Sequence, residues 1–102
     1  MLRSFGYAAR TALMTASSAN PGNPNLEAWA SAWETAVTSA FLGAYNATIA
    51  ANPALVPQEA ATILNALLLE KASYELLYEL NNRPTWLVIP LEGLLGIARN
   101  SA

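Results

Sequence analysis

Clusters of proline, glycine and asparagine divide this chain into segments rich in alanine and leucine. The clusters lie between Ser17 and Pro24, at Asn52-Pro53, and at Asn82 to Pro84. Alanine and leucine are strong helix formers, whereas proline and glycine interrupt helices. The segments contain few β-branched runs and no alternation of apolar and polar residues, which a half-buried strand would show. We therefore predict an all-α fold, a small helical bundle of about four helices.

The clusters also set the expected helix boundaries. The first helix is expected from about Leu2 to Ser17, and the second from about Asn25 to Ala51. The third is expected from about Pro57 to Asn81, because the first turn of a helix tolerates proline. Trp86 to Ile89 is predicted to be a short extended link, and Pro90 to about Asn100 a short last helix.

The balance of apolar and charged residues indicates that part of the surface expects a protein partner. Hydrophobic residues make up 54% of the 102 residues, more than a self-contained domain of this size needs. The apolar helix faces could pack on the remainder of a larger protein or on a second copy of the chain. Trp29 and Trp33, one helical turn apart, are expected in a core or an interface.

Several functions are disfavoured by what the chain lacks. It has no Asp, His or Cys, no glycine-rich phosphate loop and no metal-binding motif, so no catalytic residue, metal ligand or cofactor site is predicted within it. A net charge of -2 gives no basic patch for nucleic acid. The uncharged stretch from 35 to 58 contains polar residues and two prolines, so we expect no membrane span. A cytoplasmic location is the default for a chain without cysteine.

The third predicted helix is apolar on nearly every side in its first half, as a central helix would be, and has two faces beyond Glu70. One set lies within about 40° on a helical wheel and is predicted to pack: Leu69, Leu76 and Leu80. The opposite set lies within roughly 80°: Lys71, Tyr74, Tyr78 and Asn81. One face can therefore anchor the helix while the other recognises a ligand.

The lysine and the two tyrosines have the chemistry of a carbohydrate platform. Flat aromatic rings stack on the C–H faces of sugars, while phenol hydroxyls and the Lys71 ammonium can bond sugar hydroxyls. The alternative is that Tyr74 and Tyr78 bury their rings in core contacts. Arg83, at the end of the same helix, could contact a substrate, or could instead complement the helix dipole and the last carbonyls.

Two other features near this helix end are interpreted as structural. Glu75 and Glu79 lie one turn apart and could form an acid–base pair, but a solvated polar face is favoured. Trp86 and the aliphatic residues that follow it are expected to fold back over the third helix as a hydrophobic clasp.

Two stretches of the sequence carry a family resemblance. They are Met-Leu-Arg-Ser-Phe-x-Tyr-Ala-Ala at residues 1–9 and Glu-Lys-Ala-x-Tyr-Glu-Leu-x-Tyr-Glu-Leu-Asn-Asn-Arg-Pro-x-Trp-Leu-x-Ile-Pro-Leu-x-Gly-Leu at 70–94. Both resemble the C-terminal end of bacterial maltokinases, a module also fused to some trehalose synthases. Residues 11–60 match only in helical, alanine-rich character.

The resemblance implies a kinase-like fold of the aminoglycoside phosphotransferase type, in which ATP with Mg²⁺ phosphorylates maltose to maltose 1-phosphate. It implies that residues 1–102 are one helical subdomain of the C-terminal lobe, and that the catalytic and metal-binding Asp residues lie upstream. Lys71, Tyr74 and Tyr78 would fall on the helix that lines the maltose pocket. Alone, the chain is expected to be inactive.

This chain departs from the family pattern at three positions. The family commonly has Asp where this chain has Gly6 and Thr85, and a basic residue where it has Glu92. The leading hypothesis is a non-catalytic part of a maltokinase-like enzyme. The alternatives are a stand-alone helical interaction module, which would associate with itself or a partner, and a small membrane-associated protein.

Overall fold

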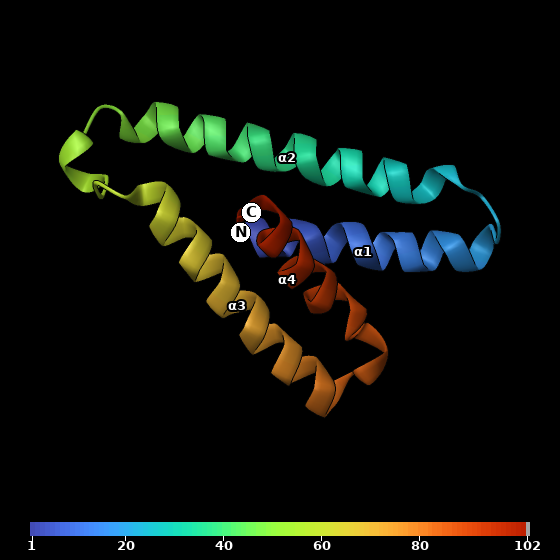
Figure 1. Cartoon of the computed structure of the whole chain (residues 1–102). Helices are drawn as coiled ribbons and strands as arrows, with labels where there is room; N and C mark the ends of the chain where they lie inside the picture. The colour runs from blue at the N-terminus through green and yellow to red at the C-terminus, as the bar shows by residue number, and fades with distance from the viewer. Residues whose placement is uncertain (102) are drawn as a thin grey trace. The chain divides into compact units, whose positions relative to one another are not determined.

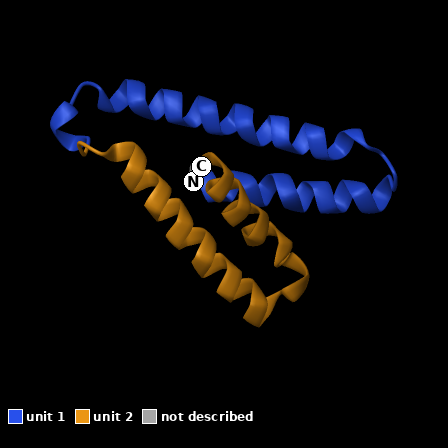
Figure 2. Cartoon of the chain, viewed as in Figure 1, with its two compact units in different colours: residues 1–56 blue, residues 57–102 orange. Residues whose placement is uncertain are grey.

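The protein is all-α, as predicted from the sequence. The computed structural model describes residues 1–101, and within them it contains α-helices and single-turn 3-10 helices but no strand (Figure 1). The elements follow in the order α1 (Leu2–Ala19), α2 (Asn25–Ile49), η1 (Pro53–Leu55), α3 (Ala60–Asn82), η2 (Pro84–Trp86) and α4 (Val88–Ser101). The chain divides into two compact units, Met1–Val56 and Pro57–Ala102 (Figure 2).

Two of the helices, α1 and α3, end at a residue that precedes proline. Asn20, before Pro21, caps α1 with φ −132° and ψ 65°, and Arg83, before Pro84, caps α3 with φ −139° and ψ 73°. The ring of a following proline disfavours helical backbone at the preceding residue, which explains both stops. Val56, before Pro57, is extended for the same reason, and α3 begins at Ala60 instead of at the proline.

The first unit contains a hairpin of α1 and α2, which lie side by side (Figure 1). In the connecting turn, Gly22 has φ 85°, a conformation that side chains with a Cβ rarely adopt. The turn is further ordered by Asn23, whose side-chain Oδ1 accepts the Asn25 backbone N–H at 3.0 Å. The hairpin therefore depends on specific turn residues as well as on packing.

Aromatic and charged contacts set the register between α1 and α2. The Phe5 and Phe41 rings meet edge to face with centroids 5.7 Å apart, and Arg10 Nη1 lies 3.8 Å from Glu27 Oε1. Between these contacts the seam is lined by the buried small residues Gly6 and Ala9. Small side chains at these positions allow two helices to approach closely.

The second unit contains α3, η2 and α4. The segment from Trp86 to Ile89, between α3 and α4, was predicted to be an extended link, and this prediction was wrong. Pro84–Trp86 forms a 3-10 turn and α4 begins already at Val88. Pro90 therefore lies in the first turn of α4, where backbone N–H groups have no partner within the helix and a missing N–H costs nothing.

Serine and threonine side chains along the helices donate hydrogen bonds to their own backbone. The acceptor in each case is the carbonyl one turn earlier, at distances from 2.8 to 3.1 Å. The donors are Thr11, Thr15, Ser18, Thr48 and Ser73. Such bonds allow serine and threonine to occupy positions between the ends of a helix without a hydrogen-bond partner from another element.

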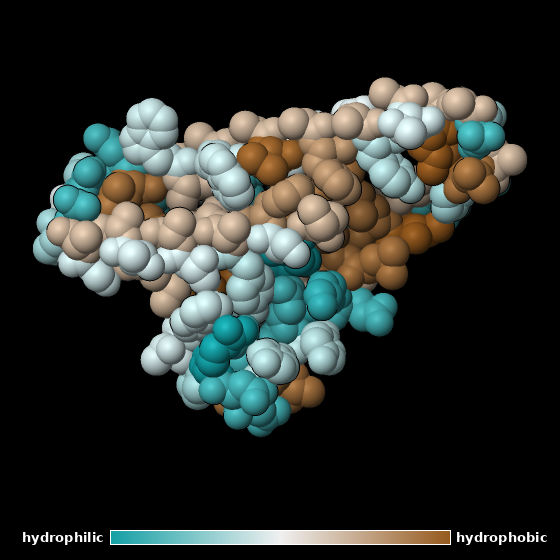
Figure 3. Space-filling model, turned by 180° about the vertical axis from the view of Figure 1, so that it is seen from behind, coloured by the Kyte–Doolittle hydropathy of each residue, from teal (hydrophilic) through white to brown (hydrophobic). Residues whose placement is uncertain are grey.

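The prediction that α3 packs through Leu69, Leu76 and Leu80 was wrong. Leu69 and Leu80 are about half exposed, and only Leu76 of the predicted packing set is partly covered. Large apolar side chains are also exposed in the first half of α3, at Ile63 and Leu67. Hydrophobic surface is visible in brown in Figure 3. Trp29 and Trp33 on α2 are exposed as well, which excludes the core interpretation for both.

Within residues 1–101, no helix combines the length and apolar character that crossing a bilayer requires.

The seam beside Gly6 gives a first testable prediction. A Cβ at Gly6 would lie 3.0 Å from Glu34 Oε1 and 3.5 Å from Arg3 Nη1, so a larger side chain would crowd this ion-rich seam. We expect Gly6→Ala to be less stable than Gly43→Ala by about 1 kcal/mol, because both changes gain the same helix propensity but only the first must displace a neighbour. An added Cβ at Gly43 meets nothing within 4 Å, which makes it the matched control. Urea unfolding of the two variants measures the difference, and equal stabilities would contradict the crowding.

Candidate functional site

The residues predicted to recognise a sugar all lie in the second unit, on α3 or directly after it. Lys71, Tyr74 and Tyr78 project from α3, and Arg83 is its C-terminal cap. The Tyr74 side chain is 63% exposed and that of Tyr78 is 45% exposed. Both rings therefore present area to solvent, and the alternative that they are buried in the core does not hold.

Each tyrosine ring of this face lies against a cation. Lys71 Nζ is 5.3 Å from the centroid of the Tyr74 ring, and Arg83 Cζ is 5.6 Å from that of Tyr78. Both distances are within the range in which a cation is attracted to the face of an aromatic ring. Lys71, Tyr74 and Tyr78 form what we call the tyrosine face, and the structure brings Arg83 to one end of it.

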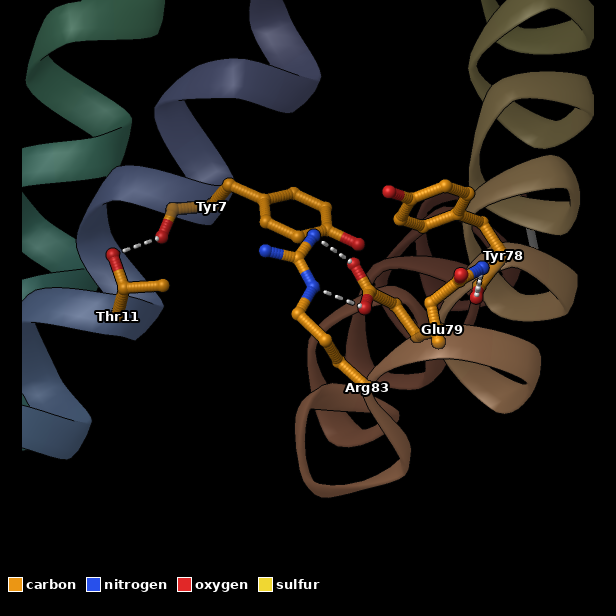
Figure 4. Close-up of polar contacts among 6 residues, drawn as sticks. Tyr7, Thr11, Tyr78, Glu79 and Arg83 are labelled. Carbon is orange, nitrogen blue, oxygen red and sulfur yellow. Dashed lines mark hydrogen bonds and ion pairs between the residues drawn. The ribbon is translucent and has the colours of Figure 1, made fainter.

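Arg83 is held by Glu79 on the last turn of α3. Its Nε donates to Glu79 Oε2 at 2.9 Å and its Nη2 donates to Glu79 Oε1 at 2.8 Å, as Figure 4 shows. The Glu79 side chain is 1% exposed, whereas that of Arg83 is 45% exposed. The expectation that Glu79 belongs to a solvated face was wrong, because a bidentate arginine allows a carboxylate to leave water.

The main chain and Trp86 complete the arrangement around Arg83. The Arg83 backbone N–H donates to Glu79 O at 2.8 Å, and the Trp86 N–H donates to Arg83 O at 2.8 Å. The Trp86 ring lies over the guanidinium, with its centroid 4.0 Å from Cζ. Trp86 thus folds back on the end of α3 as predicted, but the group it covers is a cation and not an aliphatic surface.

The buried side of α3 is not the side that the sequence suggested. Its buried residues are Ala72, Glu75 and Glu79. At 100° per residue, this set is rotated by roughly 90° from the predicted leucine set. Leucines surround α3, so hydrophobicity alone could not choose a side. The available signal was the pairing of Glu79 with Arg83 four residues later, a spacing at which acidic and basic side chains meet on a helix.

Residues from the opening motif have their own contacts in the first unit. Arg3 Cζ lies 5.9 Å from the centroid of the Tyr7 ring, and Thr11 Oγ1 donates to the Tyr7 backbone carbonyl at 2.8 Å (Figure 4). These contacts order the start of α1. The opening motif therefore has a local structural role within its own helix.

The tyrosine face can bind a neutral polar ligand by contact with aromatic rings. It offers two exposed rings, two phenol hydroxyls and one ammonium from neighbouring turns of a helix. Of the nearby carboxylates, Glu79 is engaged by Arg83 and Glu75 is buried, which disfavours a solvent-facing acid–base pair. Among the described residues, no three acidic, histidine or cysteine side chains gather where they could hold a metal ion.

No family model matches the chain, and no solved structure matches it.

The Glu79–Arg83 pair yields a second prediction. Arg83→Met removes the bidentate partner of a buried carboxylate, and we expect it to lower the free energy of unfolding by about 2 kcal/mol, less than for a fully buried pair. Adding Glu79→Met should restore most of the loss, because the charge is then removed as well. Urea unfolding measures both effects. Arg99→Met, at an exposed position of α4, is the control and should change stability little.

A double variant as unstable as Arg83→Met alone would show that the arginine acts through other contacts.

Proposed function

We propose that this chain is a C-terminal helical part of a maltokinase-like enzyme, where it contributes side chains to the wall of the maltose site. The observation that carries the proposal is the tyrosine face, on which two exposed rings and a lysine lie together. The same residues stand in the stretch at 70–94 that resembles the maltokinase C-terminus. The physical argument and the resemblance therefore favour the same side of α3.

The tyrosine face suits a neutral sugar for two reasons. An exposed ring gains free energy when the apolar C–H face of a pyranose covers it, and the phenol hydroxyl can then bond a sugar hydroxyl. Lys71 adds donors beside Tyr74, its ring partner. A disaccharide offers two pyranose rings, which is compatible with two tyrosines one turn apart.

In this proposal the chain has no direct part in phosphoryl transfer. Kinase-like enzymes hold ATP and Mg²⁺ with acidic residues and orient the nucleophile with an Asp. This chain contains no Asp, so the remainder of the lobe would supply those groups and would bind ATP and Mg²⁺. The remainder would also cover part of the exposed apolar surface. We place such an enzyme in the cytoplasm, where ATP is available.

Maltose binding tests this function directly. We expect maltose to shift the NMR signals of Tyr74 and Tyr78, and we expect Tyr74→Ala or Tyr78→Ala to weaken binding by roughly tenfold, about the free energy of one ring contact. The matched control is Tyr45→Ala, which removes an exposed tyrosine from α2 and should leave binding unchanged. Failure of maltose to perturb either tyrosine, or an equal loss in the control, would contradict the proposal.

A second candidate function is favoured by the apolar side chains that continue the tyrosine face. Ile63 and Leu67 precede Tyr74 and Tyr78 at helical spacing on the same side of α3, and both are exposed. A stripe of apolar and aromatic side chains of this kind is typical of helices that pack on another protein. The alternative is thus a helical interaction module that associates with a second copy of the chain.

Light scattering separates the second candidate from the first. An interaction module should have a dimer mass in solution, and Leu67→Glu should return it to the monomer by placing a charge in the stripe. Asn65→Glu adds the same charge at an exposed polar position of the same helix and is the control. A monomer mass for the unaltered chain across the concentration range would rule out self-association.

A further inference from the structure

We propose that Arg83 is a positioning residue for Tyr78. The inference rests on the proposed function, since it concerns how one ring of the tyrosine face is held ready for a ligand. Sequence reasoning placed Arg83 among the candidate substrate contacts. The geometry around its guanidinium points to a different role.

The Nε and Nη2 groups of Arg83 are directed at Glu79, while Nη1 takes no part in this pair. Nε and Nη2 each donate to a different carboxylate oxygen, at 2.9 and 2.8 Å. Two parallel bonds of this kind fix the plane of a guanidinium as well as its position. Because the Glu79 side chain is 1% exposed, the anchoring carboxylate is itself held in place. Redirecting Nε or Nη2 toward a sugar would break this pair and leave the Glu79 carboxylate buried without it.

The fixed guanidinium contacts two aromatic rings. Trp86 lies 4.0 Å away by ring centroid and Tyr78 lies 5.6 Å away. Trp86 is tied to the same residue through its backbone N–H, which donates to Arg83 O at 2.8 Å. Glu79 therefore positions the Arg83 guanidinium, and the guanidinium in turn contacts the rings of Tyr78 and Trp86.

This arrangement makes the two tyrosines of the face unequal. Tyr74 is paired with Lys71, a flexible side chain that is itself exposed, so its ring can adapt to a ligand. Tyr78 is paired with a guanidinium whose own position is fixed. A ring that is ordered before the ligand arrives loses less conformational entropy on binding. Arg83 would then strengthen maltose binding only through Tyr78.

A double-mutant cycle with maltose titration tests this dependence. Arg83→Lys keeps the charge but cannot form the bidentate pair, and we expect it to weaken binding three- to tenfold. In the Tyr78→Ala background the same change should have no further effect, because the ring that Arg83 positions is gone. If Arg83→Lys weakens binding by the same factor in both backgrounds, Arg83 contacts the sugar directly and the proposal is overturned. Arg99→Lys on α4 is the control.

The state of the Tyr78 ring without sugar gives an independent measurement. We expect Arg83→Lys to shift the aromatic NMR signals of Tyr78 toward values for a mobile, exposed tyrosine while those of Tyr45 stay unchanged. Glu79→Gln, which keeps the side-chain shape but weakens the anchor, should move the Tyr78 signals in the same direction. Unchanged Tyr78 signals in both variants would overturn the positioning role. Absence of maltose binding by the unaltered chain would instead overturn the proposed function, and the ring signals would still decide the role of Arg83.

Discussion

The bidentate ion pair between Glu79 and Arg83 is the interaction on which the end of α3 depends. Removing a carboxylate from water costs several kcal/mol, and attraction to a partner offsets that cost only when the geometry is good. Here the partner is the cap residue of the same helix, whose backbone N–H also bonds Glu79 O. The backbone conformation of Arg83 is in turn favoured by the proline that follows it. Local sequence therefore fixes both members of the pair.

The course of the helices could be predicted from the sequence because it is decided by neighbouring residues. Asn20 and Arg83 end helices through steric contact with the next residue in the chain, which requires no knowledge of tertiary structure. The link after Pro84 was predicted less well. The sequence predicts that the last helix starts at Pro90, whereas α4 begins at Val88 and contains that proline in its first turn.

The buried side of α3 could not be predicted in the same way. Leucines occur around most of the helix, so the apolar pattern is compatible with several orientations. A single glutamate on a helix is usually solvated, but Glu79 is buried because Arg83 pairs with its carboxylate. Tyr74 and Tyr78 are exposed because they lie far around the helix from either candidate packing side. At Gly6, the Glu34 carboxylate from α2 occupies the adjacent space, which only the paired helices could reveal.

The hydrogen bonds from serine and threonine hydroxyls to carbonyls of their own helices, along α1, α2 and α3, limit which groups can donate a hydrogen bond to a ligand. Thr11, Thr48 and Ser73 commit their protons to carbonyls of their own helices. Each of these hydroxyls can still accept a hydrogen bond, but its single O–H is already donated to the backbone. In the proposed sugar complex, discrimination between epimeric hydroxyls would therefore depend on the Lys71 ammonium and on the phenol O–H groups of Tyr74 and Tyr78, which lie at the tips of rigid rings, away from the main chain.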